Sequence, residues 1–393
     1  MIPVERWMLP DGIDEILPPE ARQIEHLRRS LLDLFHRWGY DLVIPPLMEF
    51  TDSLLVGLGK DIDLLTFKVT DQLSGRSMGI RADMTPQIAR IDAHSLRRAG
   101  VNRLCYAGHV IKAQMQSALD TRNPIQVGVE LYGEAGLEAD SEVISLLIAV
   151  MELAGVKDVC LDLGHVGIYR ALARAAGLSA EEEVVFFNLL QAKALTEIQS
   201  WIEQRVADPQ VAGWLLALPR LAGAVGILAT ARESFAGAPA EVFAALTELE
   251  TVAENLHKRY PEAQLYFDLS ELTGYHYQTG VVFAAFVPGV GAAIARGGRY
   301  DRIGEVFGRA RYATGFTADL VAISRQGATT PEPSGGIFAP VSTNPEYWQV
   351  IQTLRSQGER VVMAMAGQSS AEEDQQCDRV LVEQDGRFQV KPI

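Results

Sequence analysis

The feature that most constrains the fold is an abrupt change of pattern in the middle of the chain. From about residue 168 to residue 260 the sequence is dominated by alanine, leucine and glutamate, and strand-like segments are missing. Apolar side chains recur there at helical spacing, the longest run being Val242, Leu246, Leu249, Val252 and Leu256. Strand-like segments resume at 265–268, 281–287 and 292–296. The pattern therefore predicts a helical insertion, at about 168–260, within a core that contains strands.

The segments around this insertion mix helices and strands. Apolar spacing predicts helices at 20–38, 86–98 and 141–153, and apolar runs predict strands at 41–44, 102–112, 125–133 and 159–163. Residues 65–70 and 77–81 flank a turn at 71–75 and are typical of an antiparallel hairpin. The residues alone thus indicate the α+β class.

A change of composition marks the end of this main body, at about residue 325. Residues 326–336 are rich in proline, glycine and threonine, which is typical of a linker. Beyond it, a strand near Ile337, a helix at 347–356, a strand at 360–365 and a hairpin turning at Asp385-Gly386 predict a small α+β domain over 337–393. So short a segment buries little core alone, so we expect it to pack on the main body or on a partner.

Charge and composition exclude several classes of protein. The formal net charge of −15 opposes binding to a nucleic-acid backbone, and no apolar run of 18 residues predicts a membrane span. The N-terminus does not resemble a secretory signal, and Cys105, Cys160 and Cys377 are widely spaced, which is typical of a cytoplasmic protein. The histidines lack metal-ligand spacing, so neither a metal nor another cofactor is predicted.

Six segments, taken together and in order, resemble the histidyl type of class II aminoacyl-tRNA synthetase. They are LPDGIDEILPPEA (9–21), FHRWGYDLVIPPLMEF (35–50), SGRSMGIRADMTPQIAR (74–90), IQVGVELYG (125–133), LTGYHYQTGVVF (272–283) and ARGGRYDRIGEVFG (295–308). The resemblance covers about residues 1–325 and implies an antiparallel sheet flanked by helices. It also implies self-association through residues 35–50, which resemble motif 1, the dimer-forming element of the family.

The resemblance also implies a pocket for histidine, acting as an effector. Its candidate residues are Asp83, Thr85, Tyr106, Lys112, Gln126, Glu130, Tyr277 and Arg299. Ionised carboxylates accept hydrogen bonds and favour a cation, and Gln126 and Glu130 lie four apart in a predicted strand, so their side chains share one face. Two alternatives stay open: Gln126 and Glu130 form a polar cluster without a ligand, or Arg299 fixes its own loop by pairing with a carboxylate such as Asp301.

The same resemblance indicates what the chain lacks. Amino-acid activation needs fixed cations at the phosphates of ATP, and the family supplies three arginines there. The aligned positions are Lys112, Thr273 and Ala322. Lysine keeps a charge without the planar, bidentate group of arginine, and the other two residues are uncharged. We therefore predict no catalytic residues.

A synthetase-like fold with an amino-acid pocket but without ATP-binding arginines resembles the family of ATP phosphoribosyltransferase regulatory subunits. That resemblance implies a non-catalytic subunit that assembles with the short-form catalytic subunit as a hetero-octamer. It further implies a role in the first step of histidine biosynthesis and in its feedback regulation by histidine. The last stretch offers only Arg379, Arg387 and Lys391 as cations, so no nucleic-acid partner is expected.

Three alternatives remain at the level of the sequence. The first is an active histidyl-tRNA synthetase, and the second is a synthetase paralogue with another adenylating activity. The third is a scaffold that binds its partner but no amino acid. Binding of histidine and turnover of ATP separate these possibilities.

Overall fold

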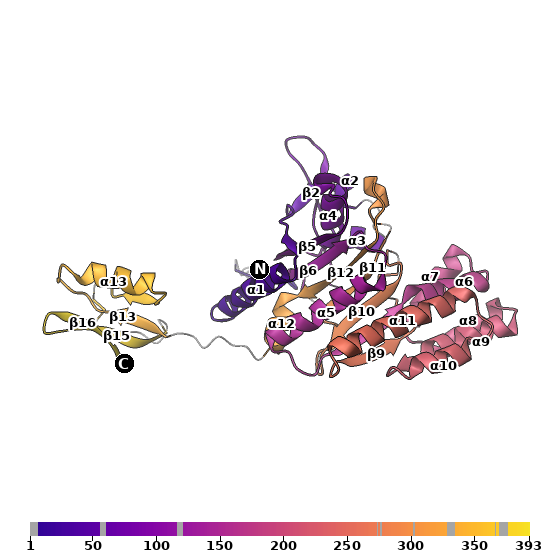
Figure 1. The fold of residues 1–393 in the computed structure, drawn as a ribbon. Coiled ribbons are helices and arrows are strands. Elements are labelled where there is room, and N and C mark those ends of the chain that lie inside the picture. The colour runs from indigo at the N-terminus through magenta and orange to yellow at the C-terminus, as the bar shows by residue number, and fades with distance from the viewer. Residues whose placement is uncertain are drawn as a thin grey trace, which may run out of the picture. The chain divides into compact units, whose positions relative to one another are not determined.

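A computed structural model describes residues 7–55, 60–115, 121–272, 274–275, 277–301, 303–327, 335–365, 367–368 and 376–393. The chain divides into two compact units, Met1–Thr329 and Thr330–Ile393. Each unit has a sheet of its own (Figure 1). Most of the predicted linker, residues 328–334, and one aligned position, Thr273, lie outside the described residues.

The first unit is built on a nine-stranded sheet. In spatial order its strands are β1 (Asp41–Leu42), β5 (Asn102–His109), β6 (Ile125–Tyr132), β12 (Ala313–Asp319), β11 (Ala295–Arg299), β10 (Val281–Phe286), β7 (Cys160–His165), β9 (Gln264–Asp268) and β8 (Ala222–Gly223). Every neighbouring pair from β5 to β7 is antiparallel, which confirms the predicted sheet. The pairs β1–β5 and β7–β9 are parallel, so the whole sheet is mixed.

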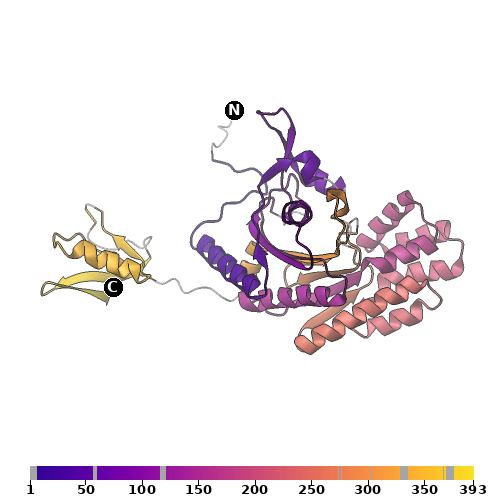
Figure 2. The ribbon, with the colours of Figure 1, turned by 45° about the horizontal axis from the view of Figure 1, so that its top comes forward.

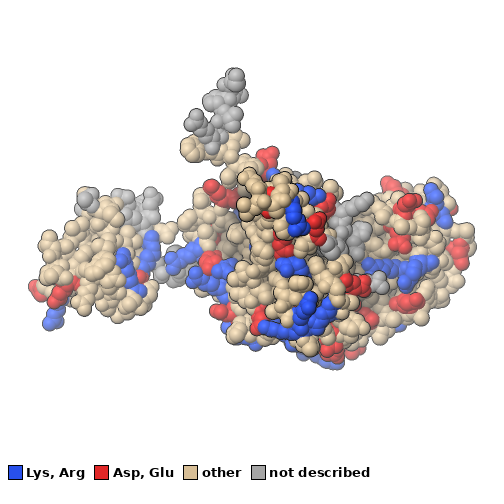
Figure 3. Space-filling model, turned by 90° about the horizontal axis from the view of Figure 1, so that it is seen from above, with Lys and Arg blue, Asp and Glu red and all other residues tan. Residues whose placement is uncertain are grey.

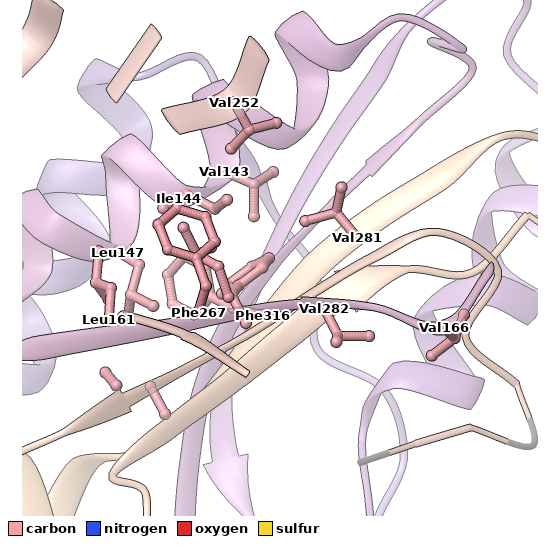
Figure 4. Close-up of a cluster of buried hydrophobic side chains, with 14 of the residues drawn as sticks. Val143, Ile144, Leu147, Leu161, Val166, Val252, Phe267, Val281, Val282 and Phe316 are labelled. Atoms are coloured by element: carbon pink, nitrogen blue, oxygen red, sulfur yellow. The ribbon is translucent and has the colours of Figure 1, made fainter. Parts of the chain in front are cut away.

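Long helices cover one face of this sheet, where the main hydrophobic core lies. They are α1 (Glu20–Arg37), α5 (Leu137–Ala154), α11 (Ala240–Arg259) and the short α12 (Leu320–Gln326). Helix α1 buries Ile24, Leu27, Leu31, Leu34 and Phe35, the apolar positions whose spacing predicts it. In Figure 4, Val143 and Leu147 of α5 gather with Phe267 and Phe316 from the strands beneath.

A hairpin and a helix that ends in a π-helical turn lie on the opposite face of the sheet (Figure 2). The predicted hairpin is confirmed: β3 (Phe67–Thr70) and β4 (Ser77–Ile80) pair antiparallel, and β2 (Met48–Phe50) adds a third strand. Helix α4 (Thr85–Arg90) continues into a π-helical turn, η1 (Ile91–Leu96). The short elements nearby are α2 (Thr51–Leu54), α3 (Lys60–Leu65) and η3 (Glu305–Phe307).

Helices dominate the stretch between β7 and β9. They are α6 (Val166–Ala175), α7 (Ala180–Gln191), α8 (Leu195–Arg205), α9 (Pro209–Ala217), η2 (Leu218–Arg220), α10 (Ile227–Ser234) and α11. Their apolar faces join the main core through Phe186, Ile202 and Leu215. The stretch also holds β8, which pairs with β9 and which the sequence pattern did not predict, because two residues cannot show alternation.

The second unit has a four-stranded sheet with one helix. Its strands, in the order β14-β13-β15-β16, are β14 (Val361–Met363), β13 (Gly336–Ala339), β15 (Cys377–Gln384) and β16 (Arg387–Pro392). Helix α13 (Tyr347–Ser356) contributes Tyr347 and Ile351 to a small core. Asp385 and Gly386 turn the last hairpin with φ of 51° and 71°, values typical of a two-residue hairpin turn.

Candidate functional site

The candidate site begins with the two faces of β6. Val127, Val129 and Leu131 point into the main core beneath α5. Because side chains alternate along a strand, Gln126 and Glu130 point to the other face, where α4 and the hairpin lie. The sequence prediction that these two side chains share a face is confirmed. A separate hydrophobic cluster closes this face, formed by Met84, Ile88, Ala89, Leu104, Tyr106, Val110, Tyr132, Tyr300, Ile303 and Ala313.

Glu130 is a deeply buried polar side chain of this face, with 1% of its surface exposed. The Thr85 hydroxyl donates to its Oε1 at 2.8 Å and the Tyr106 hydroxyl at 3.2 Å. The Tyr300 hydroxyl donates to its Oε2. Burial raises the pKa of Glu130 to about 8, although the hydroxyl donors act in the opposite direction. The carboxyl group therefore has three hydroxyl neighbours and no guanidinium or ammonium among the described hydrogen-bond partners.

Two glycines make room for this arrangement. Gly315 of β12 pairs with Glu130, and a Cβ at this glycine would collide with the Glu130 carboxylate. Gly128 lies opposite Tyr106, and a Cβ there would meet the tyrosine ring at 2.6 Å. Both glycines are therefore needed for close approach of side chains, not for unusual backbone angles.

Asp83 provides a second carboxyl group at the entrance to α4. It accepts the Thr85 N–H at 3.4 Å, and Gln126 lies beside it and accepts the Met84 N–H at 3.1 Å. Burial raises the pKa of Asp83, and the Lys112 ammonium acts against that rise. Lys112 also lowers the pKa of Asp319 at the start of α12, although burial raises it overall. Lys112 thus acts electrostatically on both carboxyl groups.

Tyr277 enters the pocket from the loop before β10. It packs against the cluster that contains Tyr106 and Tyr300. Burial raises its pKa, and the nearby carboxyl groups of Asp83 and Glu130 raise it further. The structure thus brings seven of the eight sequence-predicted residues together, namely Asp83, Thr85, Tyr106, Lys112, Gln126, Glu130 and Tyr277.

Arg299, the eighth candidate, lies on the helix side of the sheet, outside this pocket. Its Nη2 lies 2.6 Å from Asp140 of α5, and its guanidinium also donates to the backbone oxygens of Glu134 and Gly136. Both partners of the ion pair are buried, and a further contact reaches Asp301 at 3.5 Å. This geometry corresponds to the structural alternative, in which the arginine fixes its surroundings by pairing with carboxylates.

Sequence reasoning missed Tyr300, which lies in the pocket. Alternation along β11 contained the signal: if Arg299 faces α5, the next residue faces the pocket. The roles of Gly128 and Gly315 were missed as well, because they depend on which residues pair across strands. Among the described residues, no group of three or more His, Cys, Asp or Glu side chains could hold a metal ion.

The seven candidate residues form a largely buried cluster of acceptors and hydroxyl groups, which is also what the alternative of a polar cluster without a ligand predicts. Two carboxyl groups, Asp83 and Glu130, lie near three tyrosine hydroxyls and one lysine, a set that suits a zwitterion with an additional polar ring. Positive and negative side chains are intermixed on the face of this unit in Figure 3. No described helix is long and apolar enough to cross a bilayer.

Comparison with known proteins identifies the fold first. A family profile described as "Histidyl-tRNA synthetase" matches residues 12–323. The structure of an ATP phosphoribosyltransferase regulatory subunit/histidyl-tRNA synthetase from Bacillus halodurans superposes with a TM-score of 0.83 at 27% identity, covering 94% of this chain and 96% of that one. Histidyl-tRNA synthetase from Nostoc sp. PCC 7120 shares the fold, with a TM-score of 0.80 at 17% identity over 98% and 97% of the two chains. The first unit thus has the histidyl-tRNA synthetase-like class II fold.

The match of the second unit and the full-length relatives identify the family within this fold class. A profile described as "ATP phosphoribosyltransferase subunit HisZ C-terminal domain" matches residues 334–391. The ATP phosphoribosyltransferase regulatory subunit of Teredinibacter turnerae is 60% identical over 100% of both chains, and that of Saccharophagus degradans is 58% identical over 99% of both. The chain therefore belongs to the family of ATP phosphoribosyltransferase regulatory subunits, which confirms the family predicted from the sequence.

The raised pKa of Glu130 predicts a pH-dependent stability. An unfolded glutamate releases its proton near pH 4.5, whereas the folded chain holds the Glu130 proton up to about pH 8. The free energy of unfolding should therefore fall between these pH values, by on the order of 5 kcal/mol from this group. In urea titrations, Glu130→Gln should remove this part of the slope. Glu138→Gln, on the exposed side of α5, should keep it, and equal slopes for wild type and Glu130→Gln would contradict the assignment.

Proposed function

We propose that the chain is a non-catalytic regulatory subunit that assembles with the short-form catalytic subunit of ATP phosphoribosyltransferase as a hetero-octamer. In this proposal it is required for the first step of histidine biosynthesis and binds histidine in the pocket of Asp83 and Glu130. The proposal includes a cytoplasmic location, where the thiols of Cys105, Cys160 and Cys377 stay reduced. Full-length identity to named regulatory subunits supports the role, and the pocket chemistry supports the effector.

The pocket fits the three polar parts of histidine. Asp83 and Gln126 supply acceptors for an ammonium group, and Lys112 is a cation for a carboxylate. Glu130 and Tyr277 supply further polar groups nearby, which suit an imidazole ring. Feedback by histidine requires that it bind two states of the assembly with different affinity, and coupling of about 1–3 kcal/mol is typical of such regulation.

The start of α12 supports the absence of catalysis, and it is the observation that carries this proposal. Ala322, which aligns with a synthetase arginine, has no charged side chain and packs partly against the core. Asp319 accepts the N–H groups of Val321 and Ala322, at 2.9 and 3.1 Å. Asp319 therefore caps α12, and positions 319–322 carry a carboxylate and no cation. This supports a non-catalytic role, because a phosphate-binding site needs fixed cations.

Calorimetry with L-histidine tests the effector pocket. Glu130→Ala should weaken binding by about 10–100-fold, because a hydrogen bond to an ionised group of the ligand contributes about 1.5–3 kcal/mol. The control variant Glu138→Ala should bind like wild type. An absence of heat, in both the free chain and the complex with the catalytic subunit, would leave the scaffold interpretation instead.

Turnover assays test the non-catalytic role. The purified chain should give no histidine-dependent exchange of pyrophosphate into ATP above background, because fixed cations at the phosphates are missing. Added to a short-form catalytic subunit, it should raise the rate of ATP phosphoribosyl transfer. Measurable exchange would instead establish an active synthetase, and an unchanged transfer rate would contradict the regulatory role.

An exposed apolar surface supports self-association through residues 35–50. Leu42, Ile44 and Leu47 are 50%, 85% and 43% exposed, and they follow one another between β1 and β2. Clustered apolar side chains of this kind mark interaction surfaces more often than single ones do. We propose that two copies of the chain pair through this segment.

Sedimentation velocity tests the pairing. Ile44→Asp should shift the chain toward the monomer, because a charge would be buried in the proposed interface. Leu73→Asp is the matched control, since Leu73 is 98% exposed at the hairpin turn and should leave the assembly unchanged. A wild-type sedimentation coefficient for the Ile44 variant would exclude this surface as the interface.

A further inference from the structure

Two tyrosines in the loop before β10 point into different hydrophobic clusters. Tyr277 packs with the cluster that lines the candidate pocket. Tyr275, two residues earlier, packs against the main core, which extends through the helical insertion. Tyr277 N and Gln278 N both donate to the Gly274 oxygen, at 3.0 and 2.9 Å. These hydrogen bonds tie the backbone of Tyr277 to the residue immediately before Tyr275.

Helices α6 and α7 hold Tyr275 at its ring, its hydroxyl and its backbone. The hydroxyl donates to the Glu183 carboxylate at 2.9 Å. The ring lies edge-on to Tyr169, with centroids 5.1 Å apart, and stacks on Phe187 at 5.5 Å. Arg170 donates to the Tyr275 carbonyl at 2.6 Å, and its guanidinium lies 4.8 Å from the ring centroid. We call Tyr169, Arg170, Glu183 and Phe187 the Tyr275 cage.

The cage continues into the rest of the insertion. Tyr169 stacks on Phe186 at 6.0 Å, and Phe186 stacks on Trp201 of α8 at 5.1 Å. Phe186 is fully buried, so these contacts are part of the packed interior. Packed side chains have few alternative positions, so a displaced Tyr275 would require α6 and α7 to adjust.

We propose that Tyr275 is a positioning residue: the insertion, through the cage, fixes the loop so that Tyr277 closes the histidine pocket. The inference rests on the proposed function. It adds a role for the helical insertion, in which none of the candidate histidine-binding residues lies. Affinity for histidine then depends on the arrangement of α6 and α7. By reciprocity, histidine changes the stability of that arrangement by the same factor.

The alternative is that Tyr275 only completes the core of the insertion. Calorimetry on the full chain separates the two. Tyr275→Leu and Phe187→Leu should each weaken histidine binding about tenfold, whereas Tyr275→Phe, which keeps the ring contacts, should stay within about threefold of wild type. Phe235→Leu is the matched control: it removes a fully buried ring from the same insertion, away from the cage, and should leave the affinity unchanged.

Hydrogen–deuterium exchange supplies a readout that packing alone would not move. Histidine should slow exchange in residues 125–132 and in 166–191 of the wild type. At saturating histidine, Tyr275→Leu should keep the protection of residues 125–132 and lose the protection of residues 166–191. Phe187→Leu gives the same test if the tyrosine variant does not fold.

The outcomes distinguish failure of the positioning role from failure of the proposed histidine-binding function. Wild-type affinity and wild-type protection of 166–191 in both leucine variants would overturn the positioning role while leaving the pocket intact. Histidine heat with protection confined to 125–132 would overturn it as well. If the wild type shows neither heat nor protection, the histidine pocket itself is wrong, and the positioning role fails with it.

Discussion

A carboxyl group that is shut off from water must be hydrogen-bonded, protonated or paired with a cation, and the pocket face of this fold is organised around that requirement. Glu130 meets it with the hydroxyls of Thr85 in α4, Tyr106 in β5 and Tyr300, the residue after β11. Those donors reach it only because Gly315 leaves space on the neighbouring strand. The pocket therefore depends on the pairing of β6 with β12 as much as on its own polar residues.

The opposite face of the sheet also has a buried carboxyl group, but its partner is a cation. Asp140 is as deeply buried as Glu130, but the Arg299 guanidinium lies against it. That ion pair joins α5 to β11, and removal of either partner would leave an uncompensated buried charge. Glu130 has hydroxyl partners instead, and burial raises its pKa to about 8. One buried carboxyl group is thus paired with a cation, and the other is held by neutral hydroxyl groups.

Regular elements could be predicted from the sequence wherever a long periodic pattern existed. Helix α1, the β3–β4 hairpin and the Asp385-Gly386 turn all follow from local spacing and turn chemistry. The parallel edges of the sheet and the strand β8 did not follow, because they depend on partners distant in the sequence.

The pocket shows the same limit at the level of single residues. Gln126 and Glu130 could be paired by alternation along one strand. The different faces of Arg299 and Tyr300 follow from the same alternation, but the choice of face requires knowledge of what packs there. The Arg299 side chain faces α5 because it pairs with Asp140, which lies 159 positions away from it in the chain. Family resemblance transfers residue positions, whereas the direction of a side chain depends on the packed structure.

In the proposed function the chain binds histidine without catalysis, so binding can act only by changing its conformation or assembly. The antiparallel centre of the sheet suits that purpose poorly, because its strands are paired on both sides and packed on both faces. The loop that carries Tyr275 and Tyr277 is different, since Tyr277 packs against the cluster around Glu130 and Tyr275 contacts α6 and α7. Under the proposed function, binding at that cluster would therefore reach these helices through the loop, without any distortion of the sheet.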